Sequence, residues 1–199
     1  LAQRHKDVQN GLSAPPKLNL KNLLNICTKP NWCFQMLKTK RRNFGNIFGH
    51  VKGIDDMSSL SDWVTSQFDP SLDWKDVSEI RSIWDGKLIL KGIMDREDAI
   101  AAVQAGADAI IVSNHGGRQL DGTISSIDAL PRILDVVGNK CEGWMDGGIR
   151  SGQDILRAVA LGATGTLIGR AFLYGLGAGG QNGVCQTLEI LRKELDLTM

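Results

Sequence analysis

A short apolar run followed by an amphipathic stretch recurs four times within residues 86–199, and this rhythm constrains the fold most. The apolar runs begin near positions 87, 109, 142 and 165, and each is too short to cross a membrane. Strands that alternate with helices predict a parallel α/β sheet, and fully apolar strands predict burial on both faces. Helices are expected after Asp95, which would cap the first, and over about 127–137 and 152–161.

Polar side chains follow these runs, at the edge where parallel strands end. The four runs lead to Lys91, His115, Asp146 and Arg170. A (β/α)8 barrel collects its chemistry on this edge, and a whole barrel takes about 250 residues. Residues 81–199 number 119, which fits four strand–helix units. We therefore predict the carboxyl-terminal half of a TIM barrel, strands 5–8, and expect four further strands before Leu1.

Charge and glycine divide the chain into two parts. Residues 1–54 hold ten Lys or Arg and one acid, a net charge of +9, whereas residues 55–199 hold thirteen Lys or Arg and twenty-one acids, a net charge of −8. Nineteen of the 23 glycines lie at or beyond Gly86. This asymmetry predicts a domain boundary near residues 55–85. We assign residues 1–85 to the end of the fourth-strand region and a long basic loop insertion with a short helix that leads back to the barrel, and residues 86–199 to the half-barrel.

Basic, aromatic and aliphatic residues interleave over residues 17–54, and Leu18 to Ile26 have the spacing of a short amphipathic helix. Such a segment suits an anionic membrane surface, because rings and aliphatic groups enter the interface while Lys and Arg meet lipid head groups. A solvated basic face on a long loop is the alternative. Nucleic acid is not expected as a partner, since no recognisable reader motif accompanies the charge.

Neither the cysteines nor the glycine-rich string near position 180 predicts a metal or dinucleotide site. The cysteines have no CxxC spacing, so no metal is expected; they are Cys27, Cys33, Cys141 and Cys185. Residues 175–180 match GxGxxG, but they follow a helical stretch, and the position about twenty residues past Gly180, where the motif needs an acid, lies beyond Met199. We interpret this string as a glycine loop that ends a helix.

Residues 113–118, Ser-Asn-His-Gly-Gly-Arg, are the segment best suited to acid–base chemistry. His115 comes after an apolar strand and before two glycines, which predicts an exposed, tightly turned loop. Histidine exchanges a proton near neutral pH, and the guanidinium of Arg118 offers a planar fork for a carboxylate. A base beside a carboxylate clamp is therefore expected here. His5 and His50 have no such setting.

Cations and glycines at the other strand ends suit a phosphate. Lys91 ends an apolar strand, where a buried amine needs an anion and an unburied one reaches solvent. Tight turns, backbone N–H groups and guanidinium groups come from Gly147, Gly148, Arg150, Gly169 and Arg170. Such groups cradle a phosphate monoester, although glycines of this kind also serve tight turns alone.

Taken together, these residues resemble the FMN-dependent α-hydroxy-acid dehydrogenase and oxidase family, and the likeness runs nearly end to end. The segments that carry it are 90–92 (LKG), 113–121 (SNHGGRQLD), 146–150 (DGGIR) and 161–170 (LGATGTLIGR). The His-Gly-Gly-Arg-Gln-Leu-Asp string in this order is highly specific. Within the family, residues 68–71 and 84–86 are similar to the respiratory L-lactate dehydrogenases.

The resemblance implies a role for each matching residue. His115 would be the base that removes a proton from a 2-hydroxy acid, and Arg118 and Arg4 would clamp the carboxylate of that substrate. Lys91 would face the flavin N1–C2 carbonyl, where a preorganised cation stabilises charge that reaches the ring. The other residues that would bind FMN are Ser113, Asp146, Gly147, Gly148, Arg150, Gly169 and Arg170.

The resemblance also implies oxidation of L-lactate to pyruvate, with electrons passed to a membrane quinone or a cytochrome. Glycolate or mandelate is the alternative substrate, and an inert, truncated half-barrel is an alternative of another class. Segment 17–54 would be the family's long loop, which implies peripheral contact with the cytoplasmic side of a bacterial inner membrane. A homo-oligomer is expected. Because four strands would be missing, residues 1–199 alone are expected to bind FMN poorly and to turn over slowly or not at all.

Overall fold

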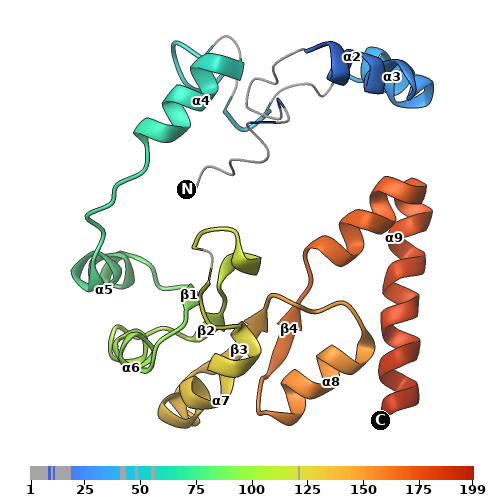
Figure 1. Ribbon diagram of the computed structural model, residues 1–199. Helices are drawn as coiled ribbons and strands as arrows, with labels where there is room; N and C mark the ends of the chain where they lie inside the picture. Colours follow the sequence, from blue (N-terminus) through green and yellow to red (C-terminus); the bar gives the residue numbers. More distant parts are fainter. Residues whose placement is uncertain are drawn as a thin grey trace. The chain divides into compact units, whose positions relative to one another are not determined.

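The computed structural model describes residues 9, 11, 19–40, 44–47, 49–54, 57–120 and 122–199 (Figure 1). The chain divides into two compact units, and the division falls between Leu72 and Asp73. Residues 73–85 therefore belong to the unit that contains the sheet, whereas the predicted domain boundary lies between residues 85 and 86. The assignment of residues 1–85 to a loop insertion and of 86–199 to a half-barrel stays a prediction.

The first unit contains three described helices, which are α2 (Leu20–Cys27), α3 (Pro30–Lys38) and α4 (Met57–Ser66). The predicted short amphipathic helix corresponds to α2, and Asn19 caps it by accepting the backbone N–H of Asn22 at 2.8 Å. Pro30 begins α3, where its missing N–H costs nothing. No residue of α2 or α3 is buried, so these helices present most of their apolar side chains to solvent.

The second unit contains a four-stranded parallel sheet in the order β1-β2-β3-β4 (Figure 1). Its strands are β1 (Ile89–Ile93), β2 (Ala109–Val112), β3 (Glu142–Asp146) and β4 (Gly165–Leu167). Its helices are α5 (Trp74–Ile83), α6 (Arg96–Gln104), α7 (Ser126–Val137), α8 (Gly152–Ala160) and α9 (Arg170–Thr198), with a 3-10 turn, η1, at His115–Gly117. Each strand pairs with the next along the chain, as in a (β/α)8 barrel, and the predicted strand and helix positions are confirmed within about two residues.

The core lies between the sheet and the helices that follow its strands. Its largest fully buried side chains are Ile110, Val112, Leu130, Ile133, Val137 and Met145. Each contributes about 1.5–3 kcal/mol by leaving water. The prediction of burial on both faces holds for β2, which is buried throughout, and is wrong for the outer strands. Ile89 of β1 is 54% exposed and Leu167 of β4 is 37% exposed, because each outer strand has a described neighbour on one side only.

Side-chain caps and glycines fix the helix ends. Asp95 accepts the backbone N–H of Glu97 at 2.8 Å, which confirms it as the cap of α6. The predicted glycine loop at 175–180 is partly wrong, since α9 continues through Gly175 and breaks only at Gly179 and Gly180. Gly175 and Gly183 then approach so closely that a Cβ on Gly183 would lie 1.9 Å from the carbonyl oxygen of Gly175. The break therefore lets the two parts of α9 pack against each other.

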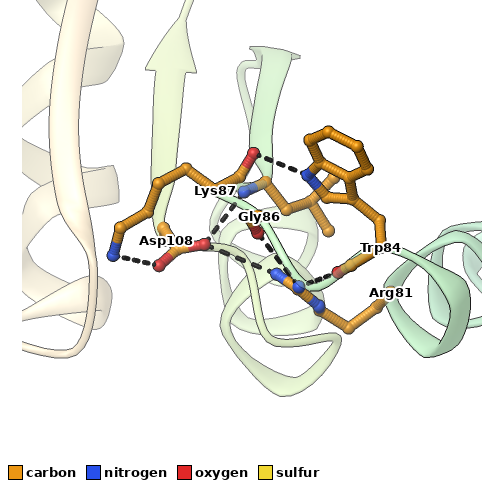
Figure 2. A network of polar contacts seen from close by, with 6 residues as sticks. Arg81, Trp84, Gly86, Lys87 and Asp108 are labelled. Carbon is orange, nitrogen blue, oxygen red and sulfur yellow. Dashed lines mark hydrogen bonds and ion pairs between the residues drawn. The ribbon is translucent and has the colours of Figure 1, made fainter.

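A polar network closes the amino-terminal end of the sheet (Figure 2). Asp108, just before β2, accepts hydrogen bonds from Lys87 Nζ at 2.7 Å and from the backbone N–H of Leu88 at 2.9 Å. Arg81 of α5 lies 3.5 Å from Asp108 and donates to the carbonyl oxygens of Trp84 and Gly86. These bonds join α5 to β1 and β2. The hydrogen bond from Lys87 is the largest of the causes that lower the pKa of Asp108 from 3.8.

Candidate active site

Three neighbouring strands bring Lys91, Ser113 and Asp146 together at their carboxyl ends. Lys91 Nζ, on β1, donates to Ser113 Oγ at 2.7 Å and to Asp146 Oδ2 at 2.5 Å. Ser113 directly follows β2 and is 4% exposed, whereas the Lys91 side chain is 43% exposed. The ammonium group is therefore held by Ser113 and Asp146, and the rest of its surface remains accessible to solvent or a ligand. It can stabilise negative charge that develops in front of it.

Asp146 Oδ1 is an unsatisfied acceptor within this cluster. The atom is buried and has no hydrogen-bond partner among the described residues, while Oδ2 of the same carboxylate is paired with Lys91. A buried acceptor left without a donor costs about 1–3 kcal/mol. A hydroxyl group of a bound molecule would remove this cost. The orphaned oxygen is therefore the point where the site fits the polyhydroxyl chain of a cofactor.

His115 stands on a left-handed turn just beyond Ser113. Its φ is +57°, and Gly116 and Gly117 follow at +66° and +69°. Among the described residues, His115 is the one residue other than glycine with positive φ. Its backbone N–H donates to Ser113 Oγ at 3.1 Å, and its side chain is exposed. The predicted exposed, tightly turned loop is confirmed, and it presents the imidazole where a small molecule can reach it.

The two glycines after β3 form a second turn at the same edge. Gly147 and Gly148 have φ of +89° and +82°, which is the region where glycine is favoured. A Cβ on Gly147 would lie 3.2 Å from Ser126 Oγ and 3.4 Å from Asn114 Oδ1, so this glycine packs against the His115 loop. A Cβ on Gly148 would meet nothing within 4 Å. Gly148 therefore borders open space beside Asp146.

Gly169 and Arg170 continue the site at the start of α9. Gly169 is the N-cap and has no capping side chain, so the first N–H groups of the helix are available to an anion. Arg170 Nη2 donates to the carbonyl oxygen of Gly116 at 3.3 Å, which links the end of β4 to the His115 loop. Arg150 is exposed and precedes α8. These placements match the predicted anion-binding edge.

An open pocket of about 690 Å³ lies over this edge. Among the predicted residues, its wall includes Lys91, Ser113 and His115; the remaining wall residues are Gly92, Met94, Asn114, Gln119, Leu120, Thr123 and Ile124. Arg118 is exposed and does not line this pocket. Arg4 lies outside the described residues. The structure therefore places an imidazole and an ammonium group in the wall of one pocket. The predicted roles of His115, Arg118 and Arg4 stay predictions.

Several wall residues were not predicted from the sequence as site residues. Asn114, Gln119 and Leu120 stand inside the specific string that contains His115, so their position in that string was the available signal. Met94, Thr123 and Ile124 carry no local signal, because they reach the pocket only when the loops after β1 and β2 fold side by side. The described residues contain no group of His, Cys, Asp and Glu able to hold a metal ion.

Comparison with known proteins identifies the family of this chain. The family model for FMN-dependent dehydrogenases matches residues 1–199, and the chain belongs to that family. An L-lactate dehydrogenase of Haemophilus influenzae (strain PittEE) is 46% identical over 98% of this chain and 51% of its own length. One from Caulobacter sp. (strain K31) is 44% identical over 98% of this chain and 52% of its own length. The chain spans about half the length of the curated relatives it matches.

Solved structures of a mandelate dehydrogenase and a mandelate oxidase have a similar backbone fold. The monotopic membrane protein (S)-mandelate dehydrogenase superposes with a TM-score of 0.91 at 34% identity, over 98% of this chain and 51% of that chain. A mandelate oxidase with (S)-4-hydroxymandelic acid superposes with a TM-score of 0.66 at 47% identity, over 71% of this chain and 40% of that chain. The predicted half of a TIM barrel agrees with this family match and with the half-length coverage. Within the described residues, no helix is both long and apolar enough to span a bilayer.

Proposed function

We propose that this chain supplies the cofactor-binding and proton-abstracting half of an FMN-dependent dehydrogenase that oxidises L-lactate to pyruvate. The observation that carries the proposal is the cluster of Lys91, Ser113 and Asp146 beside His115 at the carboxyl ends of three adjacent strands. This is the edge on which a (β/α)8 barrel performs its chemistry. The 46% identity to a named L-lactate dehydrogenase supports the choice of substrate.

The residues present fit FMN. Asp146 Oδ1 has no donor in the described chain and would accept a ribityl hydroxyl, with Ser113 beside it. Gly148 borders the open space beside Asp146, while Gly147 packs against the His115 loop. The uncapped start of α9, with Gly169, Arg170 and the exposed Arg150, suits the phosphate. FMN, when bound, accepts two electrons from the substrate. Lys91 would stabilise the negative charge that arises there.

His115 would act as the base. A histidine ring nitrogen can take a proton from a bound molecule, and the exposed position of His115 in the pocket leaves it accessible to a hydroxy acid. Oxidation of a 2-hydroxy acid to a 2-oxo acid removes two hydrogens, that is, two protons and two electrons. A base that takes a proton and an acceptor that takes the electrons must therefore both face the reacting carbon. Arg118 and Arg4 are proposed to bind the substrate carboxylate, as the family resemblance implies.

A mandelate is the second candidate substrate. The similarity to solved mandelate dehydrogenase and oxidase structures favours it, and the pocket wall includes Met94, Leu120 and Ile124, which could contact an aromatic ring. L-lactate has the stronger support, because over 98% of the chain in each case the identity is 46% to a named L-lactate dehydrogenase and 34% to the (S)-mandelate dehydrogenase. Glycolate stays a lesser alternative.

Segment 17–54 is proposed to bind the surface of a membrane. Its described helices expose apolar side chains, which are Leu20, Leu23, Leu24, Trp32, Phe34, Met36 and Leu37. Lys38 lies 5.7 Å from the centre of the Phe34 ring, so charge and aromatic surface are adjacent. The matched (S)-mandelate dehydrogenase is described as monotopic. We propose a quinone or cytochrome acceptor at the cytoplasmic side of a bacterial inner membrane; the homo-oligomer also stays a prediction.

The test uses an assembled enzyme, meaning this chain combined with the part of the Haemophilus influenzae relative that the match leaves uncovered. The protein is loaded with FMN and mixed anaerobically with L-lactate, (S)-mandelate or glycolate, and loss of the flavin's visible absorption is followed. Fastest loss with L-lactate supports the proposal, and fastest loss with mandelate establishes the second candidate. If FMN binds but no hydroxy acid reduces it, the chain belongs to an inert half-barrel and the proposed function is wrong.

A further inference from the structure

Asn114 occupies the position before His115, and both ends of its side chain are engaged. Its Oδ1 atom accepts a hydrogen bond from the N–H of Gly117 at 3.1 Å. Its Nδ2 atom donates to the carbonyl oxygen of Ile124 at 3.2 Å. The first bond closes the three-residue turn that carries the imidazole, and the second ties this turn to the segment leading into α7. One side chain therefore fixes the loop at two points.

The backbone of Asn114 is held as well. Its N–H donates to Ser126 Oγ at 3.3 Å, and Ser126, the first residue of α7, is 3% exposed. Gly147 fits closely against both partners, since a Cβ there would lie 3.2 Å from Ser126 Oγ and 3.4 Å from Asn114 Oδ1. The His115 loop, the start of α7 and the turn after β3 therefore meet at Asn114.

The conformation of His115 requires such support. A residue that carries a Cβ is strained in the left-handed region relative to the ordinary helical conformation. His115 has a φ of +57°, and the next two residues stay in the same region. Such a turn persists only where surrounding bonds stabilise it. The Asn114 side chain supplies two of these bonds, beside the donation from Gly117 N–H to the Asn114 carbonyl oxygen at 3.1 Å and the bond from Arg170 to the Gly116 carbonyl.

We propose that Asn114 is a positioning residue for His115, and that its two side-chain hydrogen bonds hold the imidazole at the place where the hydroxy acid loses its proton. This role rests on the proposed function of His115 as the base. Asn114 acts through the loop, so its loss displaces the base while Lys91 and Asp146 stay in place. A displacement of about 1 Å can reduce turnover about 100-fold.

The test compares Asn114→Ala, Asn114→Asp and Ser126→Ala in the assembled enzyme, with Asn139→Asp as the matched control. Asn139 is exposed in the turn after α7 and far along the chain from the loop, and its substitution introduces the same charge. Asn114→Asp keeps the acceptor for Gly117 N–H but sets an oxygen against the Ile124 carbonyl. Ser126→Ala removes only the bond to the Asn114 N–H. For each variant, kcat, KM, bound FMN, the Tm and amide hydrogen exchange of residues 115–118 are measured.

We expect Asn114→Ala to lower kcat about 100-fold and Asn114→Asp about tenfold, with KM within about threefold of wild type. Exchange at residues 115–118 should accelerate in both variants and stay unchanged in the control. Unchanged kcat in Asn114→Ala, or unchanged exchange, overturns the proposal. If Asn114→Ala loses FMN or folded protein, Ser126→Ala must lower kcat by itself with exchange accelerated, and its failure to do so also overturns the proposal.

Failure of the proposed function has a separate signature. In that case the wild-type assembled enzyme binds FMN and oxidises none of the three hydroxy acids. The exchange measurement then decides alone whether Asn114 holds the loop. Faster exchange in Asn114→Ala but not in Asn139→Asp supports the positioning role, and equal exchange refutes it.

Discussion

Lys91 and Asp146 lie on strands that are not neighbours, yet Lys91 Nζ and Asp146 Oδ2 are 2.5 Å apart. The ion pair passes over the end of β2, where Ser113 Oγ accepts a second hydrogen bond from the same ammonium group. The Asp146 side chain is 18% exposed, so the pair is partly shielded from solvent. Removing the cation would leave a half-buried carboxylate without its partner, which is more costly than losing an exposed pair.

Replacement of Lys91 by Met should therefore impair both charge stabilisation and the site itself. We expect kcat/KM of the assembled enzyme to fall about 100-fold or more, the size of effect seen when one preorganised donor is removed. Steady-state kinetics with L-lactate and thermal unfolding provide the measurement. Lys87→Met is the control, because Lys87 lies at the opposite end of the sheet and pairs with Asp108. An equal loss of turnover in the control would contradict a specific role for Lys91.

Replacement of His115 by Gln should remove the base and leave the cofactor site intact. We expect kcat to fall about 100- to 10,000-fold, the usual contribution of general acid–base catalysis. The visible absorption of bound FMN should match that of wild type, because His115 makes no hydrogen bond to Asp146 among those described. His50→Gln, an exposed position of the first unit, should retain wild-type turnover. Residual activity above a tenth of wild type would rule His115 out as the base.

Substitution of Gly147 or Gly148 by alanine should distinguish the cost of a steric contact from the cost of backbone strain in the stability of the protein. Both glycines have positive φ, so each variant should lose about 1–2 kcal/mol of stability from strain alone. Only the Gly147 variant also places a methyl group 3.2 Å from Ser126 Oγ. Gly147→Ala should therefore have the lower Tm, and chemical unfolding of the two variants side by side measures the difference. A lower stability for Gly148→Ala than for Gly147→Ala would contradict the close packing of Gly147 against Ser126.

The sheet and its helices could be predicted from sequence because their signals are local. The runs at 109 and 142 are bounded by turn residues, and Asp95 precedes a helical pattern. The break in α9 could not be placed, because the close approach of Gly175 to Gly183 decides which glycines stay helical. The gathering of Lys91, His115 and Asp146 at one edge of the sheet could be predicted, because each follows or ends an apolar run. Their pairing across β2 could not, because it depends on strand order and register.

Acid should weaken the network around Asp108. Its pKa is lowered in the folded protein, first by the Lys87 hydrogen bond and then by the Leu88 N–H. Its contribution to stability is therefore present above the ordinary pKa of 3.8 and is lost as the pH falls further through the lowered value. Asp108→Asn should have a lower Tm than wild type at neutral pH, and the difference should shrink below about pH 3.8. Thermal unfolding between neutral and strongly acidic pH measures it; a difference independent of pH would contradict the ionic role of Asp108.

Binding to lipid should depend on the exposed rings of α3. We expect the chain to float with vesicles that contain anionic lipid, to bind neutral vesicles less, and to be released by salt. Phe34→Ser should weaken binding about 10- to 100-fold, because a ring that enters the interface contributes about 1.5–3 kcal/mol. Phe68→Ser is the control, since Phe68 is 60% exposed but lies outside segment 17–54. Equal effects of the two substitutions would leave segment 17–54 without a special role.

The outer strands β1 and β4 each offer one row of backbone groups that no described strand covers. Parallel strands with open edges readily recruit whatever extended chain is nearby. While the assembled enzyme folds, two events would compete at these edges. One is pairing of β1 and β4 with the strands that the relative's part supplies, and the other is pairing with a neighbouring polypeptide. Yield of correctly closed protein should then depend on dilution and on chaperone supply more than on the stability of the finished enzyme.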